Sequence, residues 1–329
     1  MPASRQRVAG VLFLALGLVS VATVAQAQSL DEAVVDGRFD CRALEDLPAP
    51  DTPLAWFERS LWAGHCYRYD AHAVRIGYDG VRTLVLSHDV HDGVERGLAR
   101  FLDGPPISFE RRGRIGRLGW SDGGEAPLSP AGIAAHVGDH YRLRLGDEER
   151  IANRRVRRLD IAPLDNLRFG HRLWLDVATG LTLKQTLLDE TGRALETFQL
   201  TALDRPRLHP GEVIIDEARE APREPWQLGW LPGGFIAQPV DTQSARHGDA
   251  VAHRLYSDGL STLSLFVAPI EAADLLAPGL HRLGVSNAAV RHRDLGGEPR
   301  QVVVMGELPP RVLLRVADNL RWRGDQADE

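Results

Sequence analysis

A G-x-S-x-G pattern at residues 119–123 is the first group of side chains in this sequence that could do chemistry. In hydrolases of the α/β class, a strand before this pattern and a helix after it expose the nucleophilic serine, which would be Ser121 here. Gly124 and Pro127 follow within a few residues, and the neighbouring chain does not alternate strands with helices. We therefore interpret the pattern as a polar, glycine-rich loop and predict no catalytic residue.

Four potential metal ligands occur within residues 88–92, where the sequence reads His-Asp-Val-His-Asp. On a strand, His88 and His91 would point to opposite faces and could not readily share one ion. A solvated strand end followed by a turn is the favoured interpretation. The glycines between 113 and 119 do not form the G-x-G-x-x-G phosphate loop either. We predict neither a metal site nor a cofactor.

Positive charge is carried almost entirely by arginine, since Lys184 is the only lysine. Between Arg96 and Arg172, fifteen arginines outnumber ten acidic residues, although the formal net charge of the whole chain is -6. The acidic total argues against general nucleic-acid binding. Guanidinium groups bind phosphate and carboxylate bidentately, whereas a solvated strand face is an equally good interpretation of such a run. The predicted lipid or anion ligands are Arg144, Arg154, Arg155, Arg157 and Arg158.

Aromatic residues gather in the last third of the chain, at Trp226, Trp230, Phe235, Tyr256 and Phe266. Such residues often anchor interfaces, but in a domain of about a hundred residues they more often form the core, which is the favoured interpretation. Two loops combine aromatic residues with glycine turns, and we expect these loops to contact a partner. The predicted contact residues are Trp230, Phe235, Tyr256, Asp258 and Gly259.

The N-terminus has the pattern of a secretory signal peptide. Arg5 and Arg7 precede an apolar run from Val8 to Val24, and Ala25-Gln26-Ala27 supplies a small-x-small cleavage site. Cleavage after Ala27 predicts an exported, soluble protein whose formal charge falls from -6 to -8, because two arginines are removed. A retained N-terminal anchor is the alternative.

The two cysteines, Cys41 and Cys66, lie close together in the sequence near the mature N-terminus. In an oxidising compartment such a pair is expected to form a disulfide, which would tie the leader segment to the first strand. Two unlinked thiols, with Cys66 filling a strand position, are the alternative. The C-x-x-C spacing of redox enzymes is absent, so the predicted bond is structural.

The elements that must position these groups are mostly strands. Between residues 168 and 203, apolar and polar residues alternate in three segments separated by turns at Thr179-Gly180 and Asp189-Glu190-Thr191-Gly192. Period-two alternation predicts three antiparallel strands in a sheet with one apolar face, which other strands, a helix or a ligand must cover. Residues 65–120 are β-rich as well. Helices are expected at 52–61, where Thr52 is the N-cap, at 129–136 and at 310–320.

Composition divides the chain into two folded units. Residues 1–27 are the signal peptide, and residues 28–203 form a β-rich N-terminal domain. The charged, proline-punctuated segment 204–225 is predicted to be a linker. Residues 226–322 form a smaller α+β domain, and residues 323–329 form a polar tail.

Five short strings, in this order along the chain, carry a resemblance to a known family. They are Leu102-Asp103-Gly104-Pro105, Tyr141-Arg142-Leu143-Arg144-Leu145, Arg172-Leu173-Trp174-Leu175-Asp176, Trp230-Leu231-Pro232-Gly233-Gly234-Phe235 and Tyr256-Ser257-Asp258-Gly259-Leu260. Together with the export signal and the two-domain layout, they make the chain resemble the MucB/RseB family of periplasmic sigma-factor regulatory proteins. The resemblance covers about Leu54 to Leu320.

This resemblance implies an α+β protein. Its N-terminal domain would be an antiparallel half-barrel sheet covering helices, as in lipoprotein carriers, followed by a smaller mixed α+β domain. It implies no enzyme activity. Such a protein binds the periplasmic part of a membrane-spanning anti-sigma factor and shields it from proteolysis, and envelope stress, sensed through lipopolysaccharide or lipoprotein acyl chains, releases it.

The main alternative is a periplasmic lipid or lipoprotein carrier without a regulatory role. The apolar concavity of a half-open sheet could take an acyl chain, at ~0.8 kcal/mol per buried methylene. An exported hydrolase that uses Ser121 is a weaker alternative. Association into a homo-oligomer is left open by the sequence.

Overall fold

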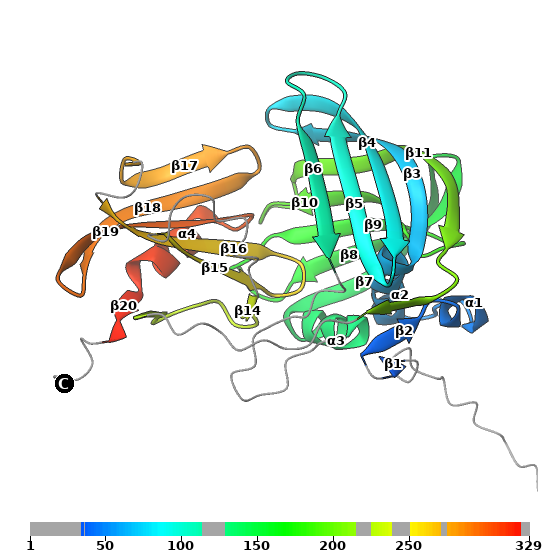
Figure 1. The fold of residues 1–329 in the computed structure, drawn as a ribbon, viewed down its shortest axis with the longest axis horizontal. Helices are drawn as coiled ribbons and strands as arrows, with labels where there is room; N and C mark the ends of the chain where they lie inside the picture. Colours follow the sequence, from blue (N-terminus) through cyan, green and yellow to red (C-terminus); the bar gives the residue numbers. More distant parts are fainter. Residues whose placement is uncertain are drawn as a thin grey trace, which may run out of the picture.

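The computed structural model describes residues 34–35, 37–113, 129–214, 225–238, 251–270 and 275–323, which form two domains (Figure 1). The predicted signal peptide and the G-x-S-x-G pattern around Ser121 lie outside these residues. Among the described residues, no helix is long and apolar enough to cross a membrane.

The N-terminal domain contains a curved nine-stranded sheet in which every neighbouring pair of strands is antiparallel. The order across the sheet is β6-β5-β4-β3-β11-β10-β9-β8-β7. The bounds are β3 Tyr67–Gly77, β4 Gly80–His91, β5 Val94–Phe101, β6 Ser108–Gly113, β7 Tyr141–Ile151, β8 Arg154–Pro163, β9 Gly170–Asp176, β10 Thr182–Leu188 and β11 Ala194–Leu208. The three strands expected between residues 168 and 203 are confirmed as β9, β10 and β11.

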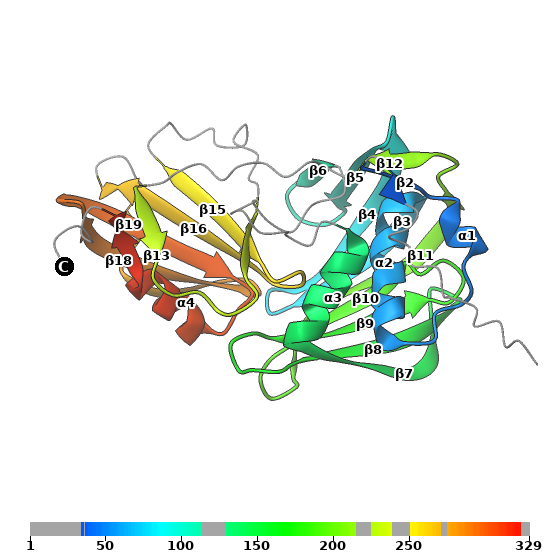
Figure 2. The same cartoon turned by 90° about the horizontal axis from the view of Figure 1, so that it is seen from below.

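Two helices, α2 (Pro53–Cys66) and α3 (Pro130–His140), lie side by side against one face of this sheet (Figure 2). The predicted N-cap is confirmed, because Thr52 Oγ1 accepts a hydrogen bond from the Ala55 amide at 3.1 Å. The helices cover the apolar face with large side chains, among them Phe57 and Trp62, which are almost completely buried. The predicted half-barrel covering helices is therefore the observed architecture.

A small sheet closes one end of this domain. It contains β1 (Val34–Val35), β2 (Arg38–Asp40) and β12 (Glu212–Ile214), and the short helix α1 (Ala43–Asp46) follows β2. The predicted disulfide between Cys41 and Cys66 is present, with a Cα–Cα distance of 5.5 Å. Cys66 is the last residue of α2 rather than a strand residue, so the bond ties the leader to a helix end.

The C-terminal domain is built on a six-stranded antiparallel sheet of order β14-β15-β16-β19-β18-β17. One helix, α4 (Pro310–Asp318), packs on this sheet and confirms the expected closing helix. The strands are β14 Ile236–Gln238, β15 Ala252–Ser257, β16 Thr262–Pro269, β17 Gly279–Leu283, β18 Ser286–Leu295 and β19 Glu298–Gly306, with a separate pair β13 Trp226–Leu228 and β20 Leu320–Trp322.

Part of the segment 204–225, which is predicted to be a linker, lies in strands. Strand β11 continues through Leu208, and β12 occupies part of the same segment. The pairing of β11 with β3 has two register shifts, one between Leu200 and Ala202 and one between Asp204 and Arg207. The structure does not describe residues 215–224.

Candidate functional site

A fully buried ion pair joins the two domains. Arg168 lies in the loop before β9, and Asp258 lies in the turn between β15 and β16. The Arg168 Nη1 to Asp258 Oδ2 distance is 2.7 Å, and both side chains are 0% exposed. Arg168 Nη2 also donates to the Gly233 carbonyl at 2.6 Å. One guanidinium from the N-terminal domain therefore binds two loops of the C-terminal domain.

The remaining polar atoms of this contact are also paired. Tyr141, at the start of β7, donates its hydroxyl to Asp258 Oδ2 at 2.8 Å, and its burial raises the pKa of the phenol. The other carboxylate oxygen, Oδ1, accepts from the backbone amides of Leu260 and Ser261. The Arg168 guanidinium lies 5.4 Å from the Tyr141 ring centroid and 5.5 Å from that of Phe235. We call Tyr141, Arg168 and Asp258 the junction triad.

Histidines surround the junction triad. His136 Nε2 donates to the Gly234 carbonyl at 2.7 Å. Gly234 has a φ of 84°, and a Cβ atom at this position would overlap the His140 ring. His171 is 1% exposed, neither of its ring nitrogens has a hydrogen-bond partner, and burial lowers its pKa to about 4. The ring of His171 is therefore neutral at physiological pH.

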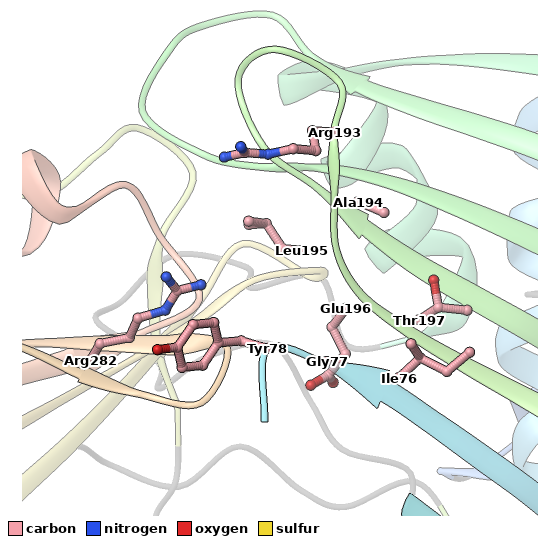
Figure 3. Close-up of a pocket in the computed structure, with 9 residues that line it drawn as sticks. All are labelled: Ile76, Gly77, Tyr78, Arg193, Ala194, Leu195, Glu196, Thr197 and Arg282. Atoms are coloured by element: carbon pink, nitrogen blue, oxygen red, sulfur yellow. The ribbon is translucent and has the colours of Figure 1, made fainter. Parts of the chain in front are cut away.

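A groove opens between the same two domains (Figure 3). It encloses about 370 Å³, and its walls come from the tip of the β3–β4 hairpin, the start of β11 and Arg282 of β17. The Tyr78 side chain is 72% exposed, and the Arg282 guanidinium lies 4.3 Å from its ring centroid. Other exposed apolar side chains lie on the β3–β4 hairpin and on β17 of the β17–β18 hairpin; they are Ile76, Val81, Leu280 and Leu283. We call this space the interdomain groove.

The five arginines predicted to bind lipid or anions lie on β7 and β8, and four of them have carboxylate partners. Arg154 binds Asp176 through two hydrogen bonds of 2.9 and 2.7 Å. The other three pair with acidic residues of β7 or β8, namely Arg155 and Arg157 with Glu148 of β7, and Arg158 with Glu149 of β7 and Asp160 of its own strand. Only Arg144 lines an open pocket, of about 710 Å³, without an ion pair among the described residues. Anion binding stays a prediction.

The predicted partner-contact residues divide into two groups. Phe235 and Asp258 are buried, and both contact Arg168 at the domain junction. Trp230 and Tyr256 are half-buried and pack against the C-terminal core, and the Trp230 ring lies 3.9 Å from the Arg315 guanidinium. Gly259 supplies the positive φ, 95°, that the turn after Asp258 needs. A partner role for these residues stays a prediction, whereas the core interpretation is confirmed for Trp226 and Phe235.

The side chains of His88 and His91 have different partners, in agreement with the prediction that they cannot share one ion. His91 is exposed, but His88 is mostly buried, so the interpretation of a solvated strand end is wrong for His88. Its Nε2 lies 3.7 Å from Glu95 Oε2, and His65 bonds the same carboxylate from the end of α2. The two imidazoles hold the pKa of Glu95 at about 2 despite its burial. No group of three His, Cys, Asp or Glu residues within the described ranges is placed to hold a metal ion.

The sequence interpretation missed the junction triad. Arg168 is one of fifteen arginines in a long segment, and Asp258 is predicted to contact a partner rather than another residue of this chain. The two residues are 90 positions apart, and a contact across that separation leaves no local periodic signal. The family resemblance was the one signal that connected the two domains, because it depends on the segments that contain Tyr141 and Asp258 occurring in that order.

Comparison with known proteins gives two adjacent family matches. Residues 52–222 match the MucB/RseB N-terminal domain, and residues 220–321 match the MucB/RseB C-terminal domain. The sigma factor AlgU regulatory protein MucB of Pseudomonas aeruginosa is 34% identical over 192 residues, which are 55% of this chain and 60% of that relative. The sigma-E factor regulatory protein RseB of Salmonella typhimurium is 26% identical over 80% of this chain and 89% of its own length.

Solved structures agree with these matches. The crystal structure of MucB in complex with MucA(peri) has a TM-score of 0.63 and 26% sequence identity, and the comparison covers 82% of this chain and 99% of that one. A second structure, of MucB without a named partner, has a TM-score of 0.59 and 28% identity over 82% of this chain. The similarity therefore extends over both domains.

Proposed function

The chain belongs to the MucB/RseB family of non-enzymatic regulatory proteins, and from that premise we propose that it captures the periplasmic domain of a membrane-spanning anti-sigma factor. Capture would shield that domain from proteolysis and so restrain an envelope-stress sigma factor. The observation that carries the proposal is the match over both domains to MucB, a protein whose solved structure includes MucA(peri).

The interdomain groove is the surface that we propose for this capture. Its exposed side chains are apolar at the hairpin tips, with Tyr78 the most exposed, and exposed apolar clusters mark interaction sites. Both domains line it, as Tyr78 and Arg282 show (Figure 3). A partner that inserts there would contact the whole two-domain protein.

We propose the periplasm as the compartment, with the signal peptide cleaved after Ala27. The disulfide between Cys41 and Cys66 supports an oxidising compartment. Release of the anti-sigma factor by lipopolysaccharide or lipoprotein acyl chains is part of the proposed function. The carrier alternative has weaker support, because Phe57 and Trp62 of α2 fill the sheet face where an acyl chain would lie.

Isothermal titration of the mature protein with the periplasmic domain of the anti-sigma factor from the same organism tests the proposal. We expect micromolar or tighter binding and slower cleavage of that domain by an added protease. Tyr78→Ala should weaken binding roughly tenfold, since exposed aromatic residues are typical hot spots. Leu164→Ala is the matched control, because Leu164 is 54% exposed and lies outside the interdomain groove. Absence of binding by the unmodified protein would refute the proposal.

A further inference from the structure

The junction triad is unusual among the ion pairs of the described residues. Only the pair between Arg168 and Asp258 has both side chains at 0% exposure, and its two members come from different domains. Apolar side chains interlock around it, since Leu167 packs on the C-terminal core and Leu260 packs on the core beneath α2 and α3. The contact is therefore shielded from bulk solvent and made by specific partners.

The energetics of such a pair suit a reversible contact. Burying two charges costs free energy that their attraction only approximately repays, so the pair adds little net stability while it requires one geometry. Separation of the domains would return both charges to water, which offsets most of the lost attraction. Removing one partner leaves the other charged group buried and unpaired, which disfavours the closed arrangement strongly.

We propose that the junction triad is a latch that holds the two domains in the arrangement that forms the interdomain groove. Its consequence for the partner rests on the proposed function, namely that the groove captures the anti-sigma factor only while the latch is closed. Tyr78 and Arg282 come from different domains and meet across the groove, so their separation depends on how the two domains pack. The latch therefore determines whether these two walls face each other.

Gly234 provides a steric test of the same contact. Its backbone carbonyl bonds His136, and a Cβ atom on it would overlap the His140 ring of the opposite domain. A Cβ atom on the neighbouring Gly233 would meet nothing within 4 Å. We therefore expect Gly234→Ala to push the His140 ring and the Gly234 loop apart and so to open the junction, whereas Gly233→Ala is a control with the same added methyl group.

Small-angle scattering of the full mature chain, without any partner, measures whether the two domains stay together. We expect Gly234→Ala and Arg168→Met to increase the radius of gyration and the maximum dimension, and Gly233→Ala to leave both unchanged. Because Gly234 has a positive φ, alanine also strains the local backbone. The double variant Gly234→Ala/His140→Ala separates the two effects, since removing the ring should restore compactness and leave the strain.

Titration with the anti-sigma periplasmic domain then tests the consequence. The opened variants should bind roughly tenfold or more weakly, and the Gly233→Ala control should bind like the unmodified protein. Circular dichroism of each variant confirms that both domains stay folded. Scattering curves of Arg168→Met and Gly234→Ala that match the unmodified protein would overturn the latch. Opened variants that bind with unchanged affinity would overturn its role in capture, and failure of the unmodified protein to bind would overturn the proposed function alone.

Discussion

Arginine–carboxylate pairs occur in two regions of this molecule and do different things in each. At the domain junction, Arg168 and Asp258 are completely buried. On the β7–β8 hairpin, Arg157 and Glu148 make a 2.8 Å contact with side chains 31% and 41% exposed. The chemical groups are the same, but water screens the second pair and not the first. Burial therefore decides which arginines specify the arrangement of the domains.

Neutralising one member of each pair should give the largest difference between the buried and the exposed site. Arg168→Met should lower the free energy of unfolding by up to roughly 3–5 kcal/mol, because the variant must either keep Asp258 buried without its cation or lose the packing of the domain junction. Glu148→Gln should cost at most about 1 kcal/mol. Chemical denaturation of the two variants measures both values. Equal effects at the two sites would contradict the role given to burial.

Removing the disulfide tests whether the junction and the leader are separate stabilising features. The bond closes a loop between residues 25 positions apart, so Cys41→Ser/Cys66→Ser should cost about 3 kcal/mol. The loss should fall on the N-terminal domain, and scattering should still show the closed arrangement. An opened shape in this variant would mean that the leader, rather than the junction triad, holds the domains.

Acid should weaken the region around the junction triad through His171. Its pKa is about 4 in the folded protein, below the usual value near 6.5, because the ring is buried without partners. The unfolded chain therefore binds more protons between these values, and stability is lost as the pH falls from about 6.5 toward 4. The loss is of the order of 2–3 kcal/mol.

His171→Leu provides the check on this pH dependence. The variant should be neutral or stabilising at pH 7, because two unsatisfied ring nitrogens are removed from the interior. Its stability should change less between pH 6.5 and 4, and part of the slope that remains should come from His140, His209 and His253, whose pKa values burial also lowers. An unchanged pH profile of unfolding midpoints would exclude His171 as the source.

Added salt should produce the smallest effect, and it should act differently on the exposed and the buried ion pair. Raising the ionic strength from 0.05 to about 1 M shortens the screening length to roughly 3 Å, which weakens exposed pairs. The energetic coupling between Arg157 and Glu148, measured by a double-mutant cycle, should fall toward zero. The coupling between Arg168 and Asp258 should persist. Loss of both couplings in salt would show that water reaches the junction.

The fold could be predicted from the sequence wherever its signals are local. Alternation and glycine turns identified β9 to β11, and Thr52 with Pro53 identified the start of α2. Side-chain environments were harder to predict. Trp174 occupies the polar parity of β9 but is 6% exposed, because it packs in the core cluster of the N-terminal domain and its ring also contacts Lys184 and Glu149. The stems of long polar side chains can pack on an aromatic ring, which parity alone does not reveal.

The candidate site could be predicted only in part. The strings that contain Tyr141, Phe235 and Asp258 indicated the family, but nothing local showed that these residues meet Arg168. The dense run from Arg154 to Arg158 was the more prominent signal for an anion site, although all four of its arginines are paired with acids. Charge density along a sequence does not report which cations remain unpaired in the fold.

Hydrogen exchange of the mature protein, measured with and without the anti-sigma periplasmic domain, shows whether the partner lies in the interdomain groove. Capture in the interdomain groove predicts slower exchange at the tip of the β3–β4 hairpin, around Tyr78, and in the β17–β18 hairpin, around Arg282. Both hairpins should change together, because they belong to different domains but line one surface. Protection confined to the β7–β8 hairpin, or to one domain alone, would contradict the account.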